Sequence, residues 1–198
     1  MQIKNRIVIG VTGSIGSGKS TAASIFKKLG AKVLDADRLT KDIYRMRPAV
    51  VKKIAETFGK DVLTAKGHLD RKKLSLRAFC DKNALRALNR IVHPHIIKRL
   101  KQEIGKKYGL IIVDAALLIE SGFNRFVDYV LLINCPLRLR LKRALGKHKL
   151  SEAEFRMRLN HQLPFIDKKR HAHFVINNSG SLNQLKGQIK KIYKEVAR

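Results

Sequence analysis

Residues 13–20, GSIGSGKS, are the stretch whose residue types and spacing most directly predict chemistry. They fit the pattern G-x-x-x-x-G-K-[S/T] without a gap, and glycines in such a loop let successive backbone N–H groups converge on phosphate oxygens. In this pattern Lys19 brings a positive charge to the β- and γ-phosphates of a nucleotide, and the Ser20 hydroxyl is a ligand for Mg²⁺. The spacing therefore predicts a nucleotide-phosphate site that uses magnesium.

The segments on either side of this loop are those that such a site needs. Residues 7–11 are a short apolar run, which predicts a buried parallel strand. After the loop, apolar residues recur at i, i+3, i+4 and i+7, which predicts an amphipathic helix: Ala22, Ile25, Phe26 and Leu29. A chance glycine-rich turn would not require this context. We therefore expect phosphate to lie at the positive N-terminal end of that helix.

Aspartates end two further expected strands. Residues 31–34 predict a second strand, which is followed by Asp35 and Asp37. Side chains two positions apart point the same way in an extended chain, and the carboxyl ends of parallel strands form the ligand crevice of an α/β fold. We expect one of the pair to face the phosphates and the other to cap the next helix. Residues 110–114 predict a third strand that ends in Asp114. This residue is either an acid that lies beside the nucleotide's magnesium ion or an ordinary residue at the end of a strand.

The rest of the chain predicts helices and two more strands, at residues 127–135 and 174–177. Residues 38–107 look largely helical, and we expect Pro94 to open a new helix after a break at His93. Without a nearby cysteine or carboxylate cluster, His93 is expected to form hydrogen bonds rather than to bind a metal. The whole pattern is that of an α/β protein with a helical insertion.

Residues 136–165 predict a small, basic pair of helices. The first follows Pro136, and the second begins at a capping box formed by Ser151 and Glu154. Such a segment above a phosphate site is typical of a closing lid, whose arginines compensate phosphoryl charge and exclude water. A solvated basic face is an equal alternative for any single arginine.

Composition narrows the class of protein. The 198 residues are 44% hydrophobic, and no apolar run approaches the ~20 residues of a membrane span. A strand is expected almost at the N-terminus, which leaves no room for a signal peptide. The two cysteines, Cys80 and Cys135, have no metal-ligand spacing, which favours a reducing compartment. We expect a cytoplasmic protein without membrane contact.

The charge is strongly basic, with 43 Lys and Arg against 15 Asp and Glu, or +28 formally. Such a field attracts polyanions, although a basic bias spread over solvated faces is an equal alternative. Aromatic residues make up only 6% of the chain, there is no Trp, and no nucleic-acid-binding motif is present. We therefore expect at most nonspecific binding of polyanions, and no specific nucleic acid partner.

Several separated stretches resemble one family, the dephospho-CoA kinases. Together they span nearly the whole chain in the expected order, and the DAD pair, the His-Pro dipeptide and the final NNSG are more specific than the phosphate loop. The stretches are VTGSIGSGKST, VLDAD, GHLDRKKL, LNRIVHP, LLIE and NNSG.

This resemblance implies a P-loop kinase domain with a parallel five-stranded sheet flanked by helices. The implied core covers about 1–37, 108–135 and 172–198, with a helical substrate-binding insertion at about 38–107 and a lid at about 136–165. The implied reaction is ATP-dependent phosphorylation of the 3′-hydroxyl of dephospho-CoA, giving coenzyme A and ADP. The alternatives are another small P-loop nucleoside or nucleotide kinase, or a P-loop ATPase that binds nucleic acid. The implied enzyme is a monomer or weak oligomer.

The family's functional residues carry over by motif position. Asp37 corresponds to the catalytic base, and His93 to a residue near the acceptor substrate. Lys19 is catalytic as well as cofactor-binding, and Ser20 is the metal ligand. The ATP-binding positions are Gly16, Ser17, Gly18, Lys19, Ser20, Thr21 and, in the lid, Arg143.

Four positions depart from the family's pattern. Ala116 stands where a proline is frequent, and Lys147 stands where a second lid arginine is expected. Lys keeps the charge but loses the bidentate fork of Arg. His173 and Asn177 replace aspartates that are common before the last strand and before the final asparagine. These departures concern the lid and the adenine pocket, and they leave the loop and the DAD pair intact.

Overall fold

The computed structural model describes residues 6–78, 81–148 and 150–196. These residues form two compact units. The sheet unit contains the residues up to Asp35 and those from Glu103 onward, and the helical unit is Ala36–Gln102. Within the described residues, no helix is long and apolar enough to cross a membrane.

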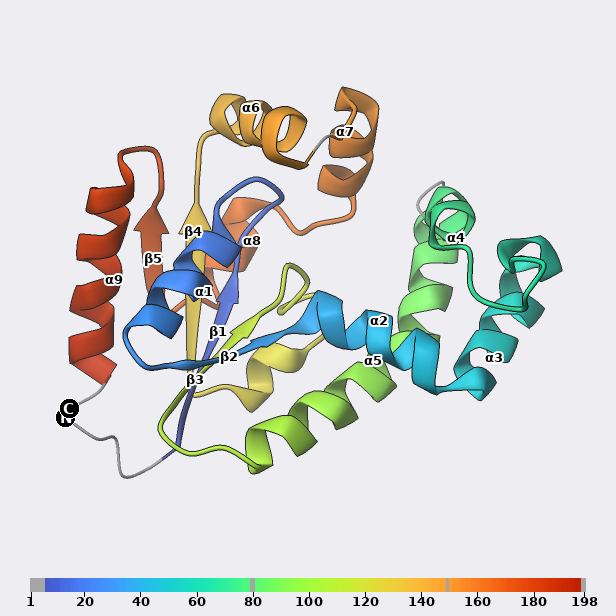
Figure 1. The fold of residues 1–198 in the computed structure, drawn as a ribbon. Helices are drawn as coiled ribbons and strands as arrows, with labels where there is room; N and C mark the ends of the chain where they lie inside the picture. The colour runs from blue at the N-terminus through green and yellow to red at the C-terminus, as the bar shows by residue number, and fades with distance from the viewer. Residues whose placement is uncertain (1–5, 79–80, 149, 197–198) are drawn as a thin grey trace. The chain divides into compact units, whose positions relative to one another are not determined.

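The sheet unit is built on five parallel strands in the order β2-β3-β1-β4-β5 (Figure 1). Every strand that the sequence predicts is present, with ends that differ by at most two residues. They are β1 Ile7–Thr12, β2 Lys32–Asp35, β3 Leu110–Asp114, β4 Tyr129–Asn134 and β5 Phe174–Asn177. The predicted five-stranded parallel α/β fold is therefore confirmed.

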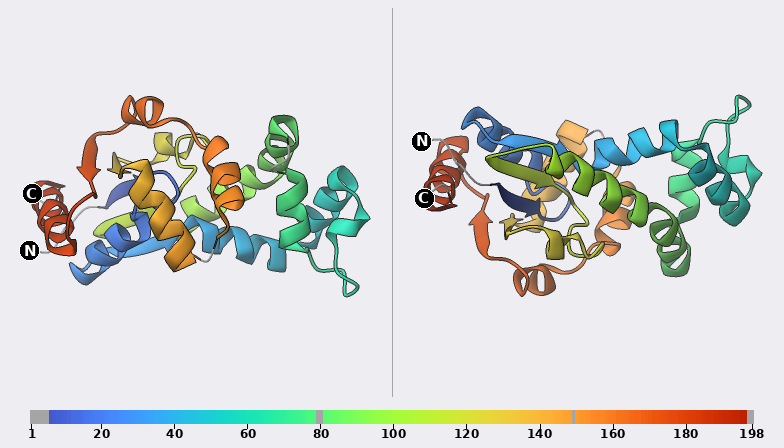
Figure 2. Two further views of the ribbon diagram at one scale, coloured as in Figure 1. Left: turned by 90° about the horizontal axis from the view of Figure 1, so that it is seen from above. Right: turned by 90° about the horizontal axis from the view of Figure 1, so that it is seen from below.

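Helices α1 (Lys19–Lys28) and α9 (Leu182–Val196) cover one face of the sheet, on the same side in the views of Figures 1 and 2. Their buried residues Phe26 and Ile189 join strand residues such as Ile112 in one apolar core. Ser181 caps α9, since its Oγ accepts a hydrogen bond from the N–H of Gln184 at 3.3 Å.

The remaining elements of the sheet unit follow β3 and β4. They are the 3₁₀ turn η2 Phe123–Phe126 and the helices α6 Leu137–His148, α7 Glu152–Asn160 and α8 Phe165–Lys169. The predicted capping box of α7 is present, with Ser151 and Glu154 each accepting a hydrogen bond from the other's N–H. α8 packs beside β4.

The helical unit has its own apolar core. Its elements are α2 Ala36–Met46, α3 Pro48–Phe58, the 3₁₀ turn η1 Lys60–Val62, α4 Arg71–Ala78 and α5 Lys82–Gly105, which ends in the sheet unit. The core includes Ile43, Ile54 and Val92.

The prediction that Pro94 opens a new helix is wrong, because α5 runs through it without a break. A proline inside a helix removes one backbone hydrogen bond and costs roughly 3 kcal/mol. Leu88 and Val92 before Pro94 are buried in the core of the helical unit, and Leu100 and Ile104 after it are also buried. Their packing offsets the local cost.

Candidate active site

The phosphate loop, residues 13–18, connects β1 to α1 at the carboxyl edge of the sheet. Gly16 and Gly18 have φ angles of +76° and +97°, a region that side chains disfavour. A Cβ atom at Gly16 would collide with the backbone carbonyl of Arg140, and one at Gly18 with the side chain of Asn178. Two distant segments thus pack so closely on the loop that only glycine fits at these positions.

Asn178 holds this loop by a hydrogen bond, and Arg143 in turn holds Asn178. Asn178 Nδ2 donates a buried hydrogen bond of 2.7 Å to the carbonyl of Ser17. Arg143 donates to the carbonyl of Asn178 at 3.1 Å and to Sγ of Cys135 at 3.3 Å. The predicted lid residue Arg143 therefore contacts the segment that holds the loop. Sequence reasoning did not single out Asn178, although it lies in the NNSG stretch.

The first turn of α1 presents Lys19, Ser20 and Thr21. Ser20 is exposed, and the other two are half-buried. No acidic side chain lies in this turn, so nothing within the helix neutralises the positive end of its dipole. This end of α1 combines backbone N–H groups, an ammonium group and two hydroxyls, which suits an anionic ligand.

Asp35 and Asp114 are register partners in the neighbouring strands β2 and β3. Asp114 also pairs with Val11, the residue two positions before the phosphate loop. Asp114 is buried and Asp35 is exposed. Two carboxylate residues therefore lie side by side at the edge of the sheet where the loop begins. Carboxylate oxygens are donors that Mg²⁺ prefers, so the chemistry of this pair fits that ion.

The other two predicted site residues belong to the helical unit. Asp37 is exposed in the first turn of α2, where its negative charge also complements the helix dipole. His93 is half-buried in the continuous helix α5.

Arg140 of α6 is a further candidate that the predicted site did not include. Its Nε and Nη1 atoms are buried and lack a hydrogen-bond partner among the described residues. Burial lowers the pKa of Arg140 below its usual range, an effect that the neighbouring Cys135 thiol opposes. Buried donor atoms without partners are costly, so an anion at this position would stabilise the half-buried Arg140 side chain. The basic pattern of residues 136–165 was the only sequence signal for it.

The structure shows contacts at three of the four positions that depart from the family pattern. His173 Nδ1 accepts the N–H of Val130 at 3.0 Å, so this imidazole serves as a hydrogen-bond acceptor beside β4. Asn177 Oδ1 accepts from Asn134 at 3.0 Å, and the carbonyl of Ala116 accepts from Lys168 at 2.9 Å. The side chain of Lys147 lies outside the described part of the structure.

A pocket of about 490 Å³ lies between the end of β5 and α9. Residues 177–181 line it on one side, with Gln184, Gln188 and Lys191 of α9 on the other. Asn178 therefore lines this pocket and also braces the phosphate loop. Its polar lining offers several amide and hydroxyl groups for hydrogen bonding.

Comparison with known proteins agrees with this geometry. The family model for dephospho-CoA kinase matches residues 7–184. A dephospho-CoA kinase of Aquifex aeolicus is 40% identical over 193 residues, which cover 96% of this chain and 97% of the relative.

Solved structures give the same result. A crystal structure of a Thermus thermophilus protein superposes with a TM-score of 0.81 at 34% identity, covering 98% of this chain and 99% of its own. The dephospho-CoA kinase of Campylobacter jejuni has a TM-score of 0.68 at 29% identity, with 97% and 98% coverage. Because the family model spans most of the chain and the relatives match over nearly their whole lengths, this chain belongs to the dephospho-CoA kinase family.

Proposed function

We propose that this protein transfers the γ-phosphoryl group of ATP to the 3′-hydroxyl of dephospho-CoA, giving coenzyme A and ADP. The observation that carries the proposal is an intact, tightly braced phosphate loop in a chain that matches this family from residue 7 to 184. A different small P-loop kinase is not favoured, since the DAD pair and the His-Pro dipeptide occur together with the loop.

The sheet unit would bind the nucleotide. Backbone N–H groups of residues 16–21 and the ammonium of Lys19 would hold the phosphates, and the unpartnered donors of Arg140 would compensate the charge that develops on the transferring group. Ser20, with Asp35 and Asp114, would hold Mg²⁺, which supplies charge neutralisation when bound. The pocket beside Asn178 is a candidate for the nucleoside part of ATP.

The helical unit would bind the acceptor, with His93 near it and Asp37 as the base. In the proposed step the 3′-oxygen forms a bond to the γ-phosphorus and its proton passes to the Asp37 carboxylate. The bond from the γ-phosphorus to the bridging oxygen breaks, and ADP leaves. Residues 136–165 would close as a lid over the phosphates and exclude water, with Arg143 keeping contact with the Asn178 segment.

The test is a coupled ADP-release assay with ATP, Mg²⁺ and dephospho-CoA, run beside adenosine and nucleoside monophosphates as acceptors. We expect turnover that requires dephospho-CoA and a product that carries one additional phosphate at the 3′-hydroxyl. Turnover only with a nucleoside or nucleotide would overturn the assignment. Omitting Mg²⁺ and adding it back tests the metal requirement directly.

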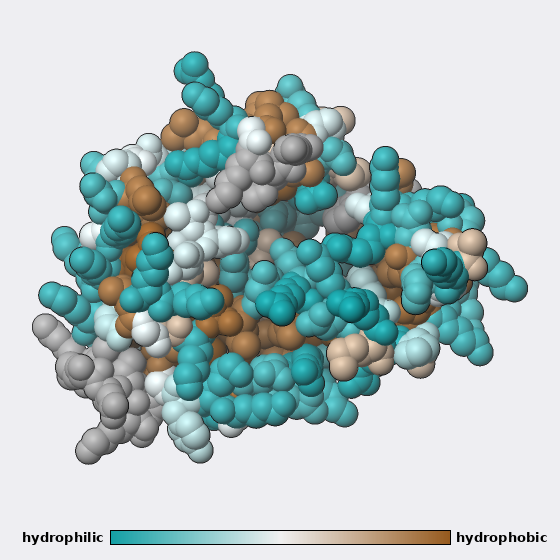
Figure 3. All heavy atoms as spheres, in the orientation of Figure 1, coloured by the Kyte–Doolittle hydropathy of each residue, from teal (hydrophilic) through white to brown (hydrophobic). Residues whose placement is uncertain are grey.

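We also infer that the protein works in the cytoplasm as a monomer or weak oligomer, with no specific nucleic acid partner. Cys135 is a free, buried thiol, which agrees with a reducing compartment. Hydrophilic side chains are spread over much of the face seen in Figure 3. The formal charge of +28 would attract polyanions nonspecifically. RNA binding should fall steeply with salt, and added RNA should leave kinase activity unchanged.

A further inference from the structure

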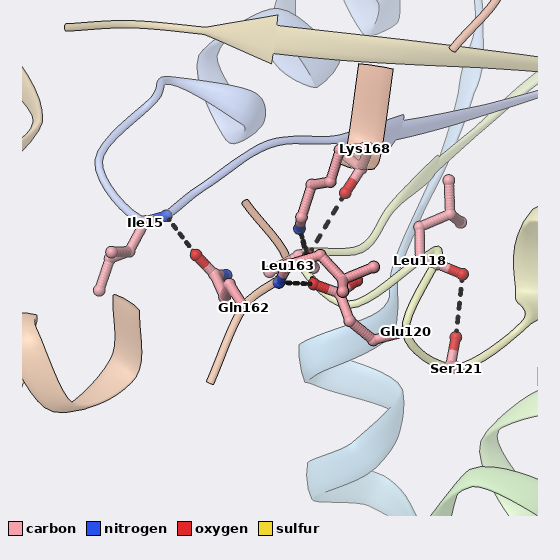
Figure 4. Close-up of polar contacts among 9 residues, drawn as sticks. Ile15, Leu118, Glu120, Ser121, Gln162, Leu163 and Lys168 are labelled. Atoms are coloured by element: carbon pink, nitrogen blue, oxygen red, sulfur yellow. Dashed lines mark hydrogen bonds and ion pairs between the residues drawn. The ribbon is translucent and has the colours of Figure 1, made fainter. Parts of the chain in front are cut away.

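Three side chains hold the segment between α7 and α8 against its surroundings: Gln162 contacts the phosphate loop, and Glu120 and Lys168 join the segment to the turn after β3 (Figure 4). Gln162 Oε1 accepts the backbone N–H of Ile15 at 2.9 Å. Glu120 Oε1 accepts the N–H of Leu163 at 2.9 Å and forms an ion pair of 2.9 Å with Nζ of Lys168. We call Glu120, Gln162 and Lys168 the lid-root bridge, because residues 162–168 lie at the C-terminal root of the proposed lid.

The ion pair of this bridge is buried. Lys168 has no exposed surface, and the Glu120 side chain is 13% exposed. Burial lowers the pKa of Lys168; Glu120 opposes this shift, and the positive charge of Lys19 adds to it. The bridge is therefore within electrostatic reach of the phosphate-binding lysine.

Stability alone does not account for the bridge. Removing two charges from water costs about as much as their attraction returns, and apolar residues of similar volume often stabilise a fold equally well. In addition, Glu120 Oε2 is buried without a hydrogen-bond partner among the described residues.

The hydrogen bonds of the bridge fix the position of the segment before α8. Lys168 Nζ donates to the carbonyl of Ala116 at 2.9 Å, and Glu120 accepts from Leu163, so the segment before α8 is held against the turn that follows β3. Gln162 is adjacent to Leu163, and it holds the N–H of Ile15 inside the phosphate loop. The orientation of the Ile15 peptide therefore depends on where the root of the lid lies.

We propose that Glu120, Gln162 and Lys168 are positioning residues that hold the phosphate loop in its nucleotide-binding conformation and couple that conformation to the lid. The proposal rests on the proposed function only in taking ATP as the nucleotide. It implies that loss of the bridge weakens ATP binding and slows turnover, while the KM for the acceptor stays unchanged.

The first test replaces Gln162 by Met, which has a similar length but no acceptor oxygen. Asn160→Met, at an exposed position at the end of α7, is the matched control. ATP binding is measured by calorimetry without acceptor, beside the melting temperature of the ligand-free protein. We expect the Kd for ATP to rise about fivefold, the effect of one net hydrogen bond, in Gln162→Met only, with a melting temperature lowered by no more than about 4 °C. A Kd within twofold of wild type would overturn the proposal.

The second test separates positioning from stability at the ion pair. Glu120→Met and Lys168→Met are each expected to lower the melting temperature, because each leaves one buried charge alone. In the double variant the melting temperature should recover, while the Kd for ATP stays at least about fivefold raised because the bonds to Leu163 and Ala116 are lost. A double variant with wild-type affinity for ATP would show that the pair serves packing only.

Failure of this proposal can be told apart from failure of the proposed function. Wild-type ATP affinity in Gln162→Met would refute the bridge and leave the kinase reaction intact. Normal ATP binding by the wild-type protein without turnover of dephospho-CoA would refute the reaction and leave the bridge to be judged by its own variants.

Discussion

The phosphate-loop region of the sheet unit and the core of the helical unit are stabilised by different kinds of contact. The loop is held by hydrogen bonds from residues far away in the sequence, such as Gln162 to Ile15 and Asn178 to Ser17. The helical unit is organised around an apolar cluster that includes Ile54.

One ion pair in the helical unit illustrates a weaker kind of polar contact. The ion pair between Arg77 and Asp61 has an N···O distance of 2.7 Å, but both side chains are about half exposed. An exposed ion pair of this type contributes little. Hydrogen bonds fix direction, whereas apolar packing is non-directional. The comparison teaches that directional contacts from distant segments gather at the phosphate loop, whereas the helical unit depends more on apolar packing.

The largest effect is expected from Asp37→Asn in the helical unit. Loss of the proposed base should reduce kcat by roughly 10²–10⁴-fold, while ATP binding to the sheet unit stays unchanged. Steady-state kinetics and calorimetry check this. If kcat stayed near wild type, Asp37 would not be the base, and Asp35 and Asp114 would be tested next.

Lys19→Ala probes the phosphate-loop region of the sheet unit. Removing charge compensation at the phosphates should lower kcat by roughly 10²–10³-fold and weaken ATP binding as well. Lys27→Ala, an exposed residue in the last turn of the same helix, is the control. Equal losses in both variants would mean that helix stability, not phosphate charge, is responsible.

Ile54→Ala tests whether packing in the helical unit is independent of the loop. Ile54 is fully buried, so the truncation should lower the free energy of unfolding by about 2–5 kcal/mol in urea denaturation. The Kd for ATP should stay within twofold, because the loop contacts are intact. A large loss of ATP affinity would contradict the separation of the two units.

Asn178→Ala tests the hydrogen bonds that hold the loop. Loss of its buried bond to Ser17 should cost about 1–3 kcal/mol and raise the Kd for ATP about tenfold. Asn134→Ala, which removes the exposed hydrogen bond from Asn134 to Asn177 and lies outside the pocket lining, should change the Kd much less. Similar effects in both variants would argue against a specific role for the buried amide.

Alkaline pH should change the free energy of unfolding in opposite directions through one buried group in each unit. Burial raises the pKa of Tyr44 in the helical unit from 10.0 to about 12, against the opposing effect of Arg71. Between these values the folded state keeps a proton that the unfolded state loses, so stability falls, by on the order of 1 kcal/mol at pH 11. In the sheet unit, burial lowers the pKa of Lys168 below 10.5, so in the window below 10.5 the unfolded state binds more protons and stability rises with pH.

Urea denaturation at pH 7, 9 and 11 checks both signs. Tyr44→Phe should remove the alkaline loss, and Lys168→Met should remove the alkaline gain. If either variant kept the wild-type pH dependence, the corresponding group would not be its source.

Local pattern was sufficient for most of the fold. The five strands and the capping box at Ser151 follow from short apolar runs and cap chemistry, which act over a few residues. The phosphate loop is equally local, since the glycines and Lys19 occur within eight consecutive positions. Pro94 shows the limit of such reasoning, because its local cost was outweighed by packing along the whole of α5.

The sequence by itself determined which segments carry chemistry and in what order they follow one another along the chain. These are the phosphate loop, the DAD pair, the His-Pro dipeptide and the basic helices. Only the tertiary structure decided which side chains hold the loop, because Asn178 and Gln162 reach it from 161 and 147 positions away. The same holds for the buried pair of Glu120 and Lys168 and for the unpartnered Arg140. Their burial and partners arise when distant segments pack together, and no local pattern of residue types encodes that geometry.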